Sequence, residues 1–315
     1  MKNQLTIGVA LACFVPAVSN AQAARVAVEA AETAFVAQAA QAGPAAAFAA
    51  HSAPNGLVVE GGTLLSAQEA RKDPATKPGQ RLAWHPVLAD VAQAGDLGYT
   101  TGPWTSYQNN RPQAAGEYVT VWRKQPDGQF RFVVDMRIER VGTAPAQGAA
   151  AAQPRLPVAA ATPSAAPINI MLDLDRKFAA AELLKPGATY QQYLSTEARL
   201  YRPGLSMMQG AAASANMKNL DGAYLFTATA GYLAASCDLG YVVGTLRRAA
   251  AGTKHPEENG SYLRIWRREA VAGWRVVVEI FNLAPNPAAA LPAAAALPAT
   301  AVAEASIAPV GKKKK

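Results

Sequence analysis

A short motif occurs twice in this chain, and the residues that follow it recur in the same order. Gly95–Tyr99 reads Gly-Asp-Leu-Gly-Tyr, and Cys237–Tyr241 reads Cys-Asp-Leu-Gly-Tyr. Each copy is followed by a Gly-x-Tyr triplet, a Trp-Arg pair and an acid. These residues are Gly116, Tyr118, Trp122, Arg123 and Asp135 after the first copy, and Gly260, Tyr262, Trp266, Arg267 and Glu279 after the second. Such self-similarity predicts two units of the same fold in one chain.

The domain organisation follows from this repeat and from composition. The length of 315 residues suits two domains of roughly 100–200 residues each. The stretch between the copies is almost entirely Ala, Pro, Gly and Gln, which cannot build a core, and the C-terminal stretch is similar. We predict a signal peptide at 1–23, a first domain at 24–141, a linker at 142–167, a second domain at 168–284 and a disordered tail at 285–315.

The N-terminus predicts export. Lys2 precedes the apolar run 5–15, and small residues allow cleavage after Ala21 or Ala23. An alternative is a lipoprotein signal with acylation of Cys13, but the preceding residues match that pattern poorly. The apolar run is too short for a permanent span, which needs about 20 residues. We therefore expect a periplasmic or secreted protein with no transmembrane span.

Several classes of partner and cofactor are not expected. The formal charge is +8, but Lys312–Lys315 supply half of it, and no basic stripe with interleaved aromatics is present, so nucleic acid is not an expected partner. His51, His85 and His255 lack the spacing of metal ligands. No Gly-rich phosphate loop follows a strand. We predict no metal and no cofactor, and we interpret Cys237 as a small apolar residue rather than a nucleophile.

Each copy begins with helical periodicity and ends in strands. The predicted buried stripes are Ala31, Ala34, Phe35 and Gln38-Ala39 in the first copy, and Met171, Leu174, Phe178 and Ala181 in the second. Later, Pro126-Asp127-Gly128 predicts a tight hairpin between two long strands. Val119 and Val121 alternate with Tyr118, Thr120 and Trp122, so both sheet faces should be covered. The pattern predicts an α+β fold: two tandem cone-shaped barrels, each with helices packed on a curved antiparallel sheet.

The chain resembles the SnoaL-like, or nuclear-transport-factor-2-like, superfamily, whose relatives include ketosteroid isomerase. The resemblance rests on the opening helix with Phe35, the Gly-Asp-Leu-Gly-Tyr-Thr-x-Gly run at Gly95–Gly102 and the segment Gly116–Asp135. It covers 24–141 and again 168–284, and it is closest to the uncharacterised branch. It implies a curved sheet around a helix, an apolar pocket at the open end and dimers packed through outer sheet faces. A tandem chain can form that pair internally, as a pseudo-dimer, or as a homodimer.

The resemblance also implies a carboxylate or His inside the cone, where burial raises a carboxyl pKa and suits it to proton transfer. The catalytic candidates are His51, Asp135 and Tyr118. The residues expected to line ligand pockets are Phe35, Trp84 and Tyr99 in the first copy, and Phe178, Tyr193 and Tyr241 in the second.

Structural alternatives stand beside each candidate. His51 follows a helix face, where it can cap the helix or bond a backbone carbonyl. By strand alternation Asp135 shares a face with Arg131, as Glu279 does with Arg275, which favours salt-bridged surface. Asp96 and Asp238 each lie at a turn, where an Asp side chain ordinarily bonds the backbone.

Three functions remain open from the sequence. The first is an exported protein that binds a small, largely apolar molecule. The second is a cofactor-free isomerase, dehydratase or cyclase that uses His51 or Asp135 with Tyr118. The third is an interaction module in which paired sheets and the lysine tail, Lys312–Lys315, dock to a partner or to an anionic envelope surface.

Overall fold

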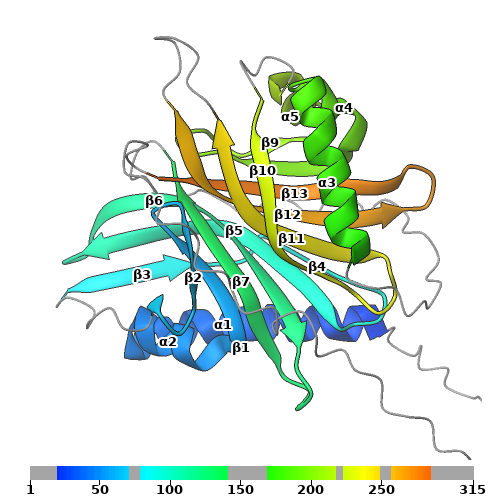
Figure 1. Cartoon of the computed structure of the whole chain (residues 1–315). Coiled ribbons are helices and arrows are strands. Elements are labelled where there is room, and N and C mark those ends of the chain that lie inside the picture. The colour runs from blue at the N-terminus through cyan, green and yellow to red at the C-terminus, as the bar shows by residue number, and fades with distance from the viewer. Residues whose placement is uncertain (1–19, 71–78, 141–168, 218–222, 249–256, 285–315) are drawn as a thin grey trace, which may run out of the picture.

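The computed structural model describes residues 20–70, 79–140, 169–217, 223–248 and 257–284. The predicted linker, the tail with Lys312–Lys315 and all of the leader up to residue 19 lie outside the described residues, and the predicted domain boundaries and export stay predictions. Figure 1 shows four layers, with two β-sheets in the middle and helices on the outer face of each sheet. The predicted α+β class is therefore confirmed, with two units of similar construction.

The first repeat forms a seven-stranded sheet with two helices. Its strand order is β2-β1-β7-β6-β5-β3, and β4 also pairs with β5. The elements are α1 (Asn20–Ala42), α2 (Pro44–His51), β1 (Ser52–Glu60), β2 (Thr63–Ser66), β3 (Gln80–Trp84), β4 (Leu88–Val91), β5 (Leu97–Gln108), β6 (Arg111–Lys124) and β7 (Phe130–Glu139).

The second repeat forms a six-stranded sheet with three helices. Its strand order is β10-β11-β12-β13-β8-β9. The elements are α3 (Asn169–Leu184), α4 (Ala188–Tyr193), β8 (Leu194–Tyr201), β9 (Met208–Gln209), α5 (Gly210–Met217), β10 (Leu225–Leu233), β11 (Leu239–Arg248), β12 (Glu258–Glu269) and β13 (Gly273–Leu283). In both repeats the strand after the second helix pairs in parallel with the last strand, so the sheets are mixed rather than wholly antiparallel.

Local sequence explains the main turns. The hairpin between β6 and β7 closes at Gly128, whose φ of 82° is a left-handed conformation that glycine adopts without steric cost. At the turn before β5, Gly95 has a φ of 71°, and its counterpart Cys237 has a φ of 54°. The turn at Gly128 confirms the hairpin predicted at Pro126-Asp127-Gly128. The second copy of the motif places a cysteine where a side chain is strained.

The described residues form three hydrophobic cores, and the middle core joins the repeats. The first cone is the space between α1, α2 and the first sheet, and the second cone is the space between α3, α4, α5 and the second sheet. The interface layer lies between the two sheets and includes Val119, Val121 and Met136 from one repeat with Leu263 and Ile265 from the other. This arrangement explains why strands carry apolar side chains on both faces: one face fills a cone, and the other packs against the second sheet.

The two copies of the repeated turn bond each other. Asp96 Oδ2 accepts hydrogen bonds from Ala235 N at 3.0 Å and from the Tyr232 hydroxyl at 3.2 Å. In return, Asp238 Oδ2 accepts from Gln93 N at 3.0 Å. We expected these aspartates to bond backbone at turns, and they do, but the backbone belongs to the turn of the other repeat.

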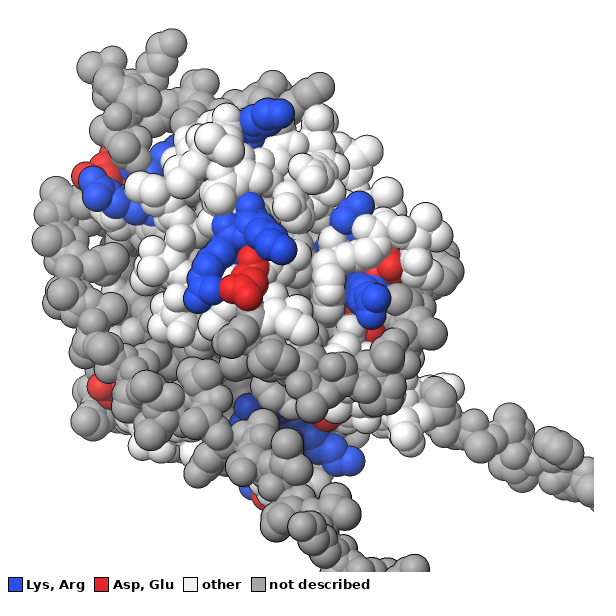
Figure 2. All heavy atoms as spheres, turned by 45° about the vertical axis from the view of Figure 1, so that its right-hand side comes forward, with Lys and Arg blue, Asp and Glu red and all other residues white. Residues whose placement is uncertain are grey.

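Two further observations concern the ends of the elements and the surface. Ala24 is the first buried residue of α1, and Ala21 one turn earlier packs partly against the same core, so cleavage after Ala23 would remove one packed residue of the helix. In the described part of the chain, no helix is both long and apolar enough to cross a membrane. Figure 2 shows a face that is largely uncharged, on which basic side chains lie beside acidic ones.

Candidate functional site

The buried face of α1 carries a carboxylate. The face consists of Ala24, Val28, Glu32, Phe35 and Ala39. The predicted stripe is thus confirmed for Phe35 and Ala39, Ala31 packs partly against the same core, and the prediction is wrong for Ala34, which is exposed. Glu32 exposes none of its surface. The sequence interpretation missed Glu32 because a charged residue on an amphipathic helix ordinarily faces solvent. A usable signal was present, since an acid precedes the helix phenylalanine by three residues in both copies, as Asp175 does in the second.

Three donors from the sheet converge on Glu32. Trp84 Nε1 on β3 donates to Oε1 at 2.5 Å. Thr100 Oγ1 on β5 and Trp122 Nε1 on β6 donate to Oε2 at 2.5 Å and 3.1 Å. Trp122 Nε1 also lies 3.1 Å from Thr100 Oγ1. The carboxyl group is thus held in one orientation by three strands of the sheet.

Burial raises the pKa of Glu32 to about 7. Removal from water disfavours the charged form, and the nearby Asp135 carboxylate acts in the same direction. The hydrogen bonds from Thr100, Trp84 and Trp122 favour the carboxylate but do not offset burial. Among the described residues, no cation pairs with Glu32. At neutral pH this group is therefore divided between acid and base forms.

Tyr118 and Asp135 face the same interior as Glu32. The Tyr118 hydroxyl is fully buried and makes no well-formed hydrogen bond to a described residue. Burial raises the pKa of Tyr118 well above its usual value, and the charges of Glu32 and Asp135 raise it further. Asp135 Oδ2 accepts a hydrogen bond from Thr120 at 2.8 Å, and Oδ1 lies 3.2 Å from Arg137 Nε. The structure thus brings two of the predicted candidates together and adds Glu32 and Arg137.

The prediction that Asp135 belongs to a salt-bridged surface with Arg131 is wrong. Asp135 is buried, and Arg131 pairs instead with Asp127 at 2.6 Å. The reason is a β-bulge: Val121 pairs with Val134, but Trp122 pairs with Phe132, which leaves an extra residue in β7. A bulge reverses the alternation of side chains beyond it. The same irregularity in β13 separates Glu279 from Arg275, so that prediction is wrong for the same reason.

Aromatic side chains fill the first cone. Phe35 packs against Trp84 with ring centroids 4.9 Å apart, and against Phe132 at 5.5 Å. Phe48 on α2 covers both phenylalanines, at 5.0 Å from Phe35 and 5.5 Å from Phe132. The structure thus places Phe35 and Trp84 inside the cone, as predicted. Packed rings stand where an open apolar pocket was expected.

His51 lies apart from this cluster. Its Nε2 is 2.9 Å from Gln38 Oε1, and its ring is 5.3 Å from that of Phe35. Burial lowers the pKa of His51. The histidine therefore joins the end of α2 to α1 through a side chain, rather than through the expected backbone carbonyl, and it is not one of the groups bonded to Glu32.

The second cone contains a compensated charge network. Arg264 Nη1 pairs with Asp175 Oδ1 at 2.5 Å, and Arg264 Nη2 pairs with Glu279 Oε1 at 2.6 Å. Arg202 also pairs with Glu279. Burial alone would raise the pKa of Glu279, but the guanidinium groups of Arg202 and Arg264 outweigh it and lower the pKa. Phe178 and Tyr193 pack here with ring centroids 5.4 Å apart, inside the cone as predicted.

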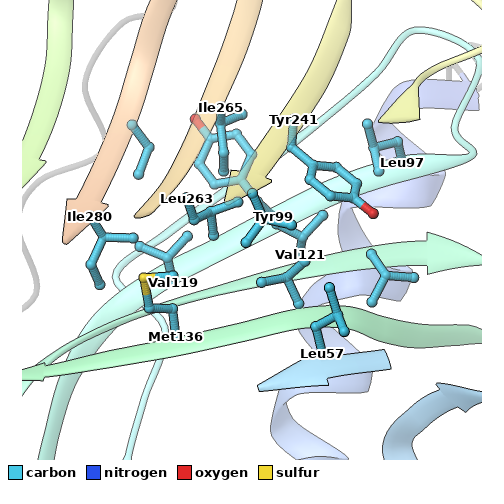
Figure 3. Packing of buried hydrophobic residues seen from close by; sticks show 14 of the residues in the cluster. Leu57, Leu97, Tyr99, Val119, Val121, Met136, Tyr241, Leu263, Ile265 and Ile280 are labelled. Carbon is cyan, nitrogen blue, oxygen red and sulfur yellow. The ribbon is translucent and has the colours of Figure 1, made fainter. Parts of the chain in front are cut away.

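Two predicted pocket residues lie elsewhere. Tyr99 and Tyr241 are in the interface layer, where Figure 3 shows them among Val121, Leu263 and Ile265. Strand alternation explains this, because the neighbours Gly98 and Gly240 are the positions that approach the helices. The prediction that these tyrosines line the cones is therefore wrong.

Two hollows lie outside both cones. One, of about 30 Å³, lies between the repeats and is lined by Asp90, Tyr99, Glu197, Arg199 and Arg267 among others; it has room for about one water molecule. The other is an open surface depression of about 580 Å³ near the β6–β7 hairpin. It is lined by Ala49, Ala50, Ser52, Pro54, Gln68, Gln125, Pro126, Asp127 and Arg131. No cluster of metal-ligating side chains occurs in the described part of the chain.

Comparison with known proteins concerns the fold alone. The sequence matches no protein-family model and no curated protein. A solved protein of unknown function with a cystatin-like fold from Nostoc punctiforme is 10% identical, covering 37% of this chain and 91% of that one, with a TM-score of 0.32. A ketosteroid isomerase-like protein from Erwinia carotovora atroseptica is 16% identical, covering 36% and 95%, with a TM-score of 0.31.

A third similar structure is an NTF2-like protein of unknown function from Pseudomonas putida. It is 14% identical, covers 36% of this chain and 84% of its own, and has a TM-score of 0.30. Each similarity spans a length close to that of one repeat. These similarities assign neither a family nor an activity to this chain.

Proposed function

We propose that the first cone binds a small, largely apolar carbonyl compound and that Glu32 moves a proton on it without a cofactor. One observation carries this proposal: the carboxyl of Glu32 is fully buried, held by three donors and divided between its acid and base forms near neutral pH. A general acid–base group works best when its pKa lies near the working pH.

The proposed reaction needs only groups of this cone. The Glu32 carboxylate takes a proton from the carbon next to the carbonyl, and the electron pair of that C–H bond moves onto the carbonyl oxygen. The Tyr118 hydroxyl, which is buried without a well-formed bond of its own, donates a hydrogen bond to that oxygen. Glu32 then returns the proton to carbon, at the same or a conjugated position, so atoms and charge balance.

Binding requires the cone to open. Glu32 and Phe35 are fully buried, and Phe48 on α2 covers the aromatic layer. The helix α2 has only eight residues and follows Gly43, whose φ is 86°. We propose that α2 moves outward to admit the ligand, because it is the shorter of the two helices that cover the cone and is joined to α1 through a glycine.

The test is hydrogen exchange on a simple hydrophobic ketone. The purified protein is incubated with 1-indanone in D₂O, and loss of the α-proton signal is followed by NMR over a range of pH. The wild type should accelerate exchange, with a rate that rises through pH of about 7 as the carboxylate of Glu32 forms. Glu32→Gln should lower the catalysed rate about 100-fold or more.

Asp175→Asn is the matched control, because it changes the equivalent acid in the second cone. It should keep the exchange activity, provided that circular dichroism shows a folded protein. Equal rates for the wild type and a folded Glu32→Gln variant would show that Glu32 is structural, and the proposal would then be abandoned.

We also propose that the chain acts outside the cytoplasm, as its leader sequence predicts. Cell fractionation should recover it in the periplasm or medium. Mass spectrometry should find a mature N-terminus at Gln22 or Ala24, whereas an acylated Cys13 would reveal a lipoprotein and a retained Lys2 would contradict export.

A further inference from the structure

We propose that the molecule bound in the first cone carries an anionic group, a carboxylate or a group of similar geometry, which Arg137 recognises at the mouth of the cone. This inference rests on the proposed function, because it concerns the same cone and names the class of molecule that the cone takes. It assigns a binding role to a residue that the sequence interpretation did not consider.

Arg137 lies between the buried carboxyl groups and the solvent. It extends from β7 on the same side as Asp135, two residues earlier in the strand. Its guanidinium carbon is 5.0 Å from the centroid of Phe48 and 4.8 Å from that of Trp84. Its side chain is 17% exposed, whereas that of Asp135 is 4% exposed. A molecule that enters when α2 moves would meet Arg137 before it meets Glu32.

The hydrogen-bonding capacity of Arg137 is largely unused. A guanidinium group has five N–H donors. Among the described residues the guanidinium group contacts one acid, with Nε 3.2 Å from Asp135 Oδ1, and Nε and Nη2 are buried without a well-formed hydrogen bond. Buried donors without partners are costly, and a ligand oxygen would satisfy them. A planar carboxylate matches the guanidinium fork.

The second repeat fixes the position of Arg137. Asn282 Nδ2 donates to the backbone oxygen of Arg137 at 2.5 Å, so the strand that carries the arginine is bonded across the interface between repeats. In the second cone the equivalent residue is Phe281, whose ring lies 3.6 Å from the guanidinium carbon of Arg202. That arginine is already paired with Glu279. The first cone thus has an arginine, with buried donors left over from its contact with Asp135, where the second cone has Phe281.

The geometry defines a ligand with two parts. Its anionic group would lie against Arg137, and its apolar body would replace part of the packing of Phe48 and Trp84 against Phe35. Trp84 itself bonds Glu32, so the far end of the body would reach the carboxyl group that moves the proton.

The probes for the test are 3-benzoylpropanoate and its primary amide, which share a ketone and an aromatic body and differ in charge. Dissociation constants are measured by ligand-observed NMR, and α-proton exchange is measured in the same samples. The wild type should bind the carboxylate about tenfold or more tightly than the amide, as expected for a charge-assisted hydrogen bond. Arg137→Met should remove this preference, and Arg137→Lys should restore part of it.

Arg131→Met is the matched control. Arg131 lies on the same strand but pairs with Asp127 near the hairpin, so its loss should leave the preference unchanged. If Arg137→Met does not fold, Arg137→Lys serves as the test variant, and cooperative thermal unfolding shows that it is folded.

The outcomes separate this inference from the proposed function. A carboxylate preference that depends on Arg137, without proton exchange, supports anion recognition and contradicts the proposed reaction. Exchange at equal rates on the acid and the amide, unchanged in Arg137→Lys, supports the reaction and overturns anion recognition. Equal affinity for the two probes, including no measurable binding of either, also overturns it.

Discussion

The two cones place acids at matching positions but treat their charge differently. Glu32 in the first cone corresponds to Asp175 in the second, and Asp135 corresponds to Glu279. In the second cone Arg264 lies between the two acids and pairs with both. In the first cone the residue at that position is Thr120, which bonds Asp135 alone.

The cations beside Glu279, and their absence beside Glu32 among the described residues, shift the pKa values of these two buried carboxyls in opposite directions. Without a cation beside it, Glu32 has a pKa of about 7, whereas the two arginines lower the pKa of Glu279. The second cone holds a buried ion network beside Glu182, whose pKa burial also raises to about 7, and the first cone holds Glu32 with no cation paired to it among the described residues. The difference teaches that duplicated folds need not share a site, because Arg202 and Arg264 compensate an acid of the second cone in a way that the first cone does not repeat.

The paired tryptophans show the same divergence. Trp122 Nε1 bonds Glu32 and Thr100, whereas Trp266 Nε1 is buried with no partner among the described residues. The second cone lacks a hydroxyl at the position of Thr100, where it has Val242. Its polar groups are thus arranged around the arginines rather than around the helix acid.

The largest effect is expected on removing the cation that joins the two acids of the second cone. Arg264→Met leaves Asp175 and Glu279 buried with less compensation, and it should lower the free energy of unfolding by about 3–5 kcal/mol. Arg137→Met, the matched change in the first cone, should cost clearly less because Arg137 pairs with one acid and reaches solvent. Urea denaturation measures both. A larger loss for Arg137→Met would break the comparison.

The pH dependence of stability should have opposite signs for the two glutamates. The native state keeps the proton on Glu32 up to pH of about 7, whereas the unfolded chain releases it near 4.5. Unfolding therefore releases a proton in this window, so the free energy of unfolding falls as pH rises. Each unit of difference between the folded and unfolded pKa contributes about 1.4 kcal/mol, which gives a fall of about 3 kcal/mol in total. Glu32→Gln should remove the share of Glu32 in that fall and leave the share of Glu182, whose pKa burial also raises to about 7.

Glu279→Gln should act in the other direction. The pKa of Glu279 is lowered in the folded state, so its stabilisation is present above the unfolded value and is lost as pH falls through the folded one. The variant should lose stability at neutral pH and vary less in acid. Unfolding free energies from pH 4 to 8 test both variants, and parallel curves for Glu32→Gln and wild type would contradict the assignment.

The reciprocal turns should contribute equally to joining the repeats. Asp96→Ala removes acceptors for Ala235 N and Tyr232, and Asp238→Ala removes the acceptor for Gln93 N. Each should lower the free energy of unfolding by about 1–2 kcal/mol, the cost of a lost hydrogen bond to a charged group. A single cooperative transition should remain, and two separate transitions in the wild type would show that the repeats unfold independently.

The smallest expected effect concerns the same turns. Cys237→Gly should raise stability by about 1 kcal/mol, since Cys237 adopts a φ of 54° that costs a side chain about that much. Gly95→Ala should lower stability, because Gly95 has a φ of 71° and a Cβ there would lie 3.1 Å from that of Ala24. Thermal unfolding checks the signs.

The sequence predicted what depends on repetition and periodicity. The duplicated motif gave two units, and the apolar alternation around Val119 and Val121 gave a sheet covered on both faces. The site was less accessible, because Glu32 contradicts the usual polarity of a helix face and the bulge in β7 places Asp135 on the side that simple alternation excludes. Tyr99 was misplaced because strand alternation alone does not say which face meets the helix.

The most direct test is a titration of Glu32 itself. The protein is labelled with ¹³C at glutamate carboxyl carbons, and the Glu32 resonance is identified because it is missing from the spectrum of Glu32→Gln. The Glu182 resonance serves as a reference for a buried carboxyl, because burial also raises the pKa of Glu182 to about 7. We predict that the Glu32 signal titrates at pH of about 7 while the Glu279 signal stays in its ionised form down to pH of about 4.5. A Glu32 signal that titrates near 4.5 would contradict the claim that the first cone holds an uncompensated carboxyl.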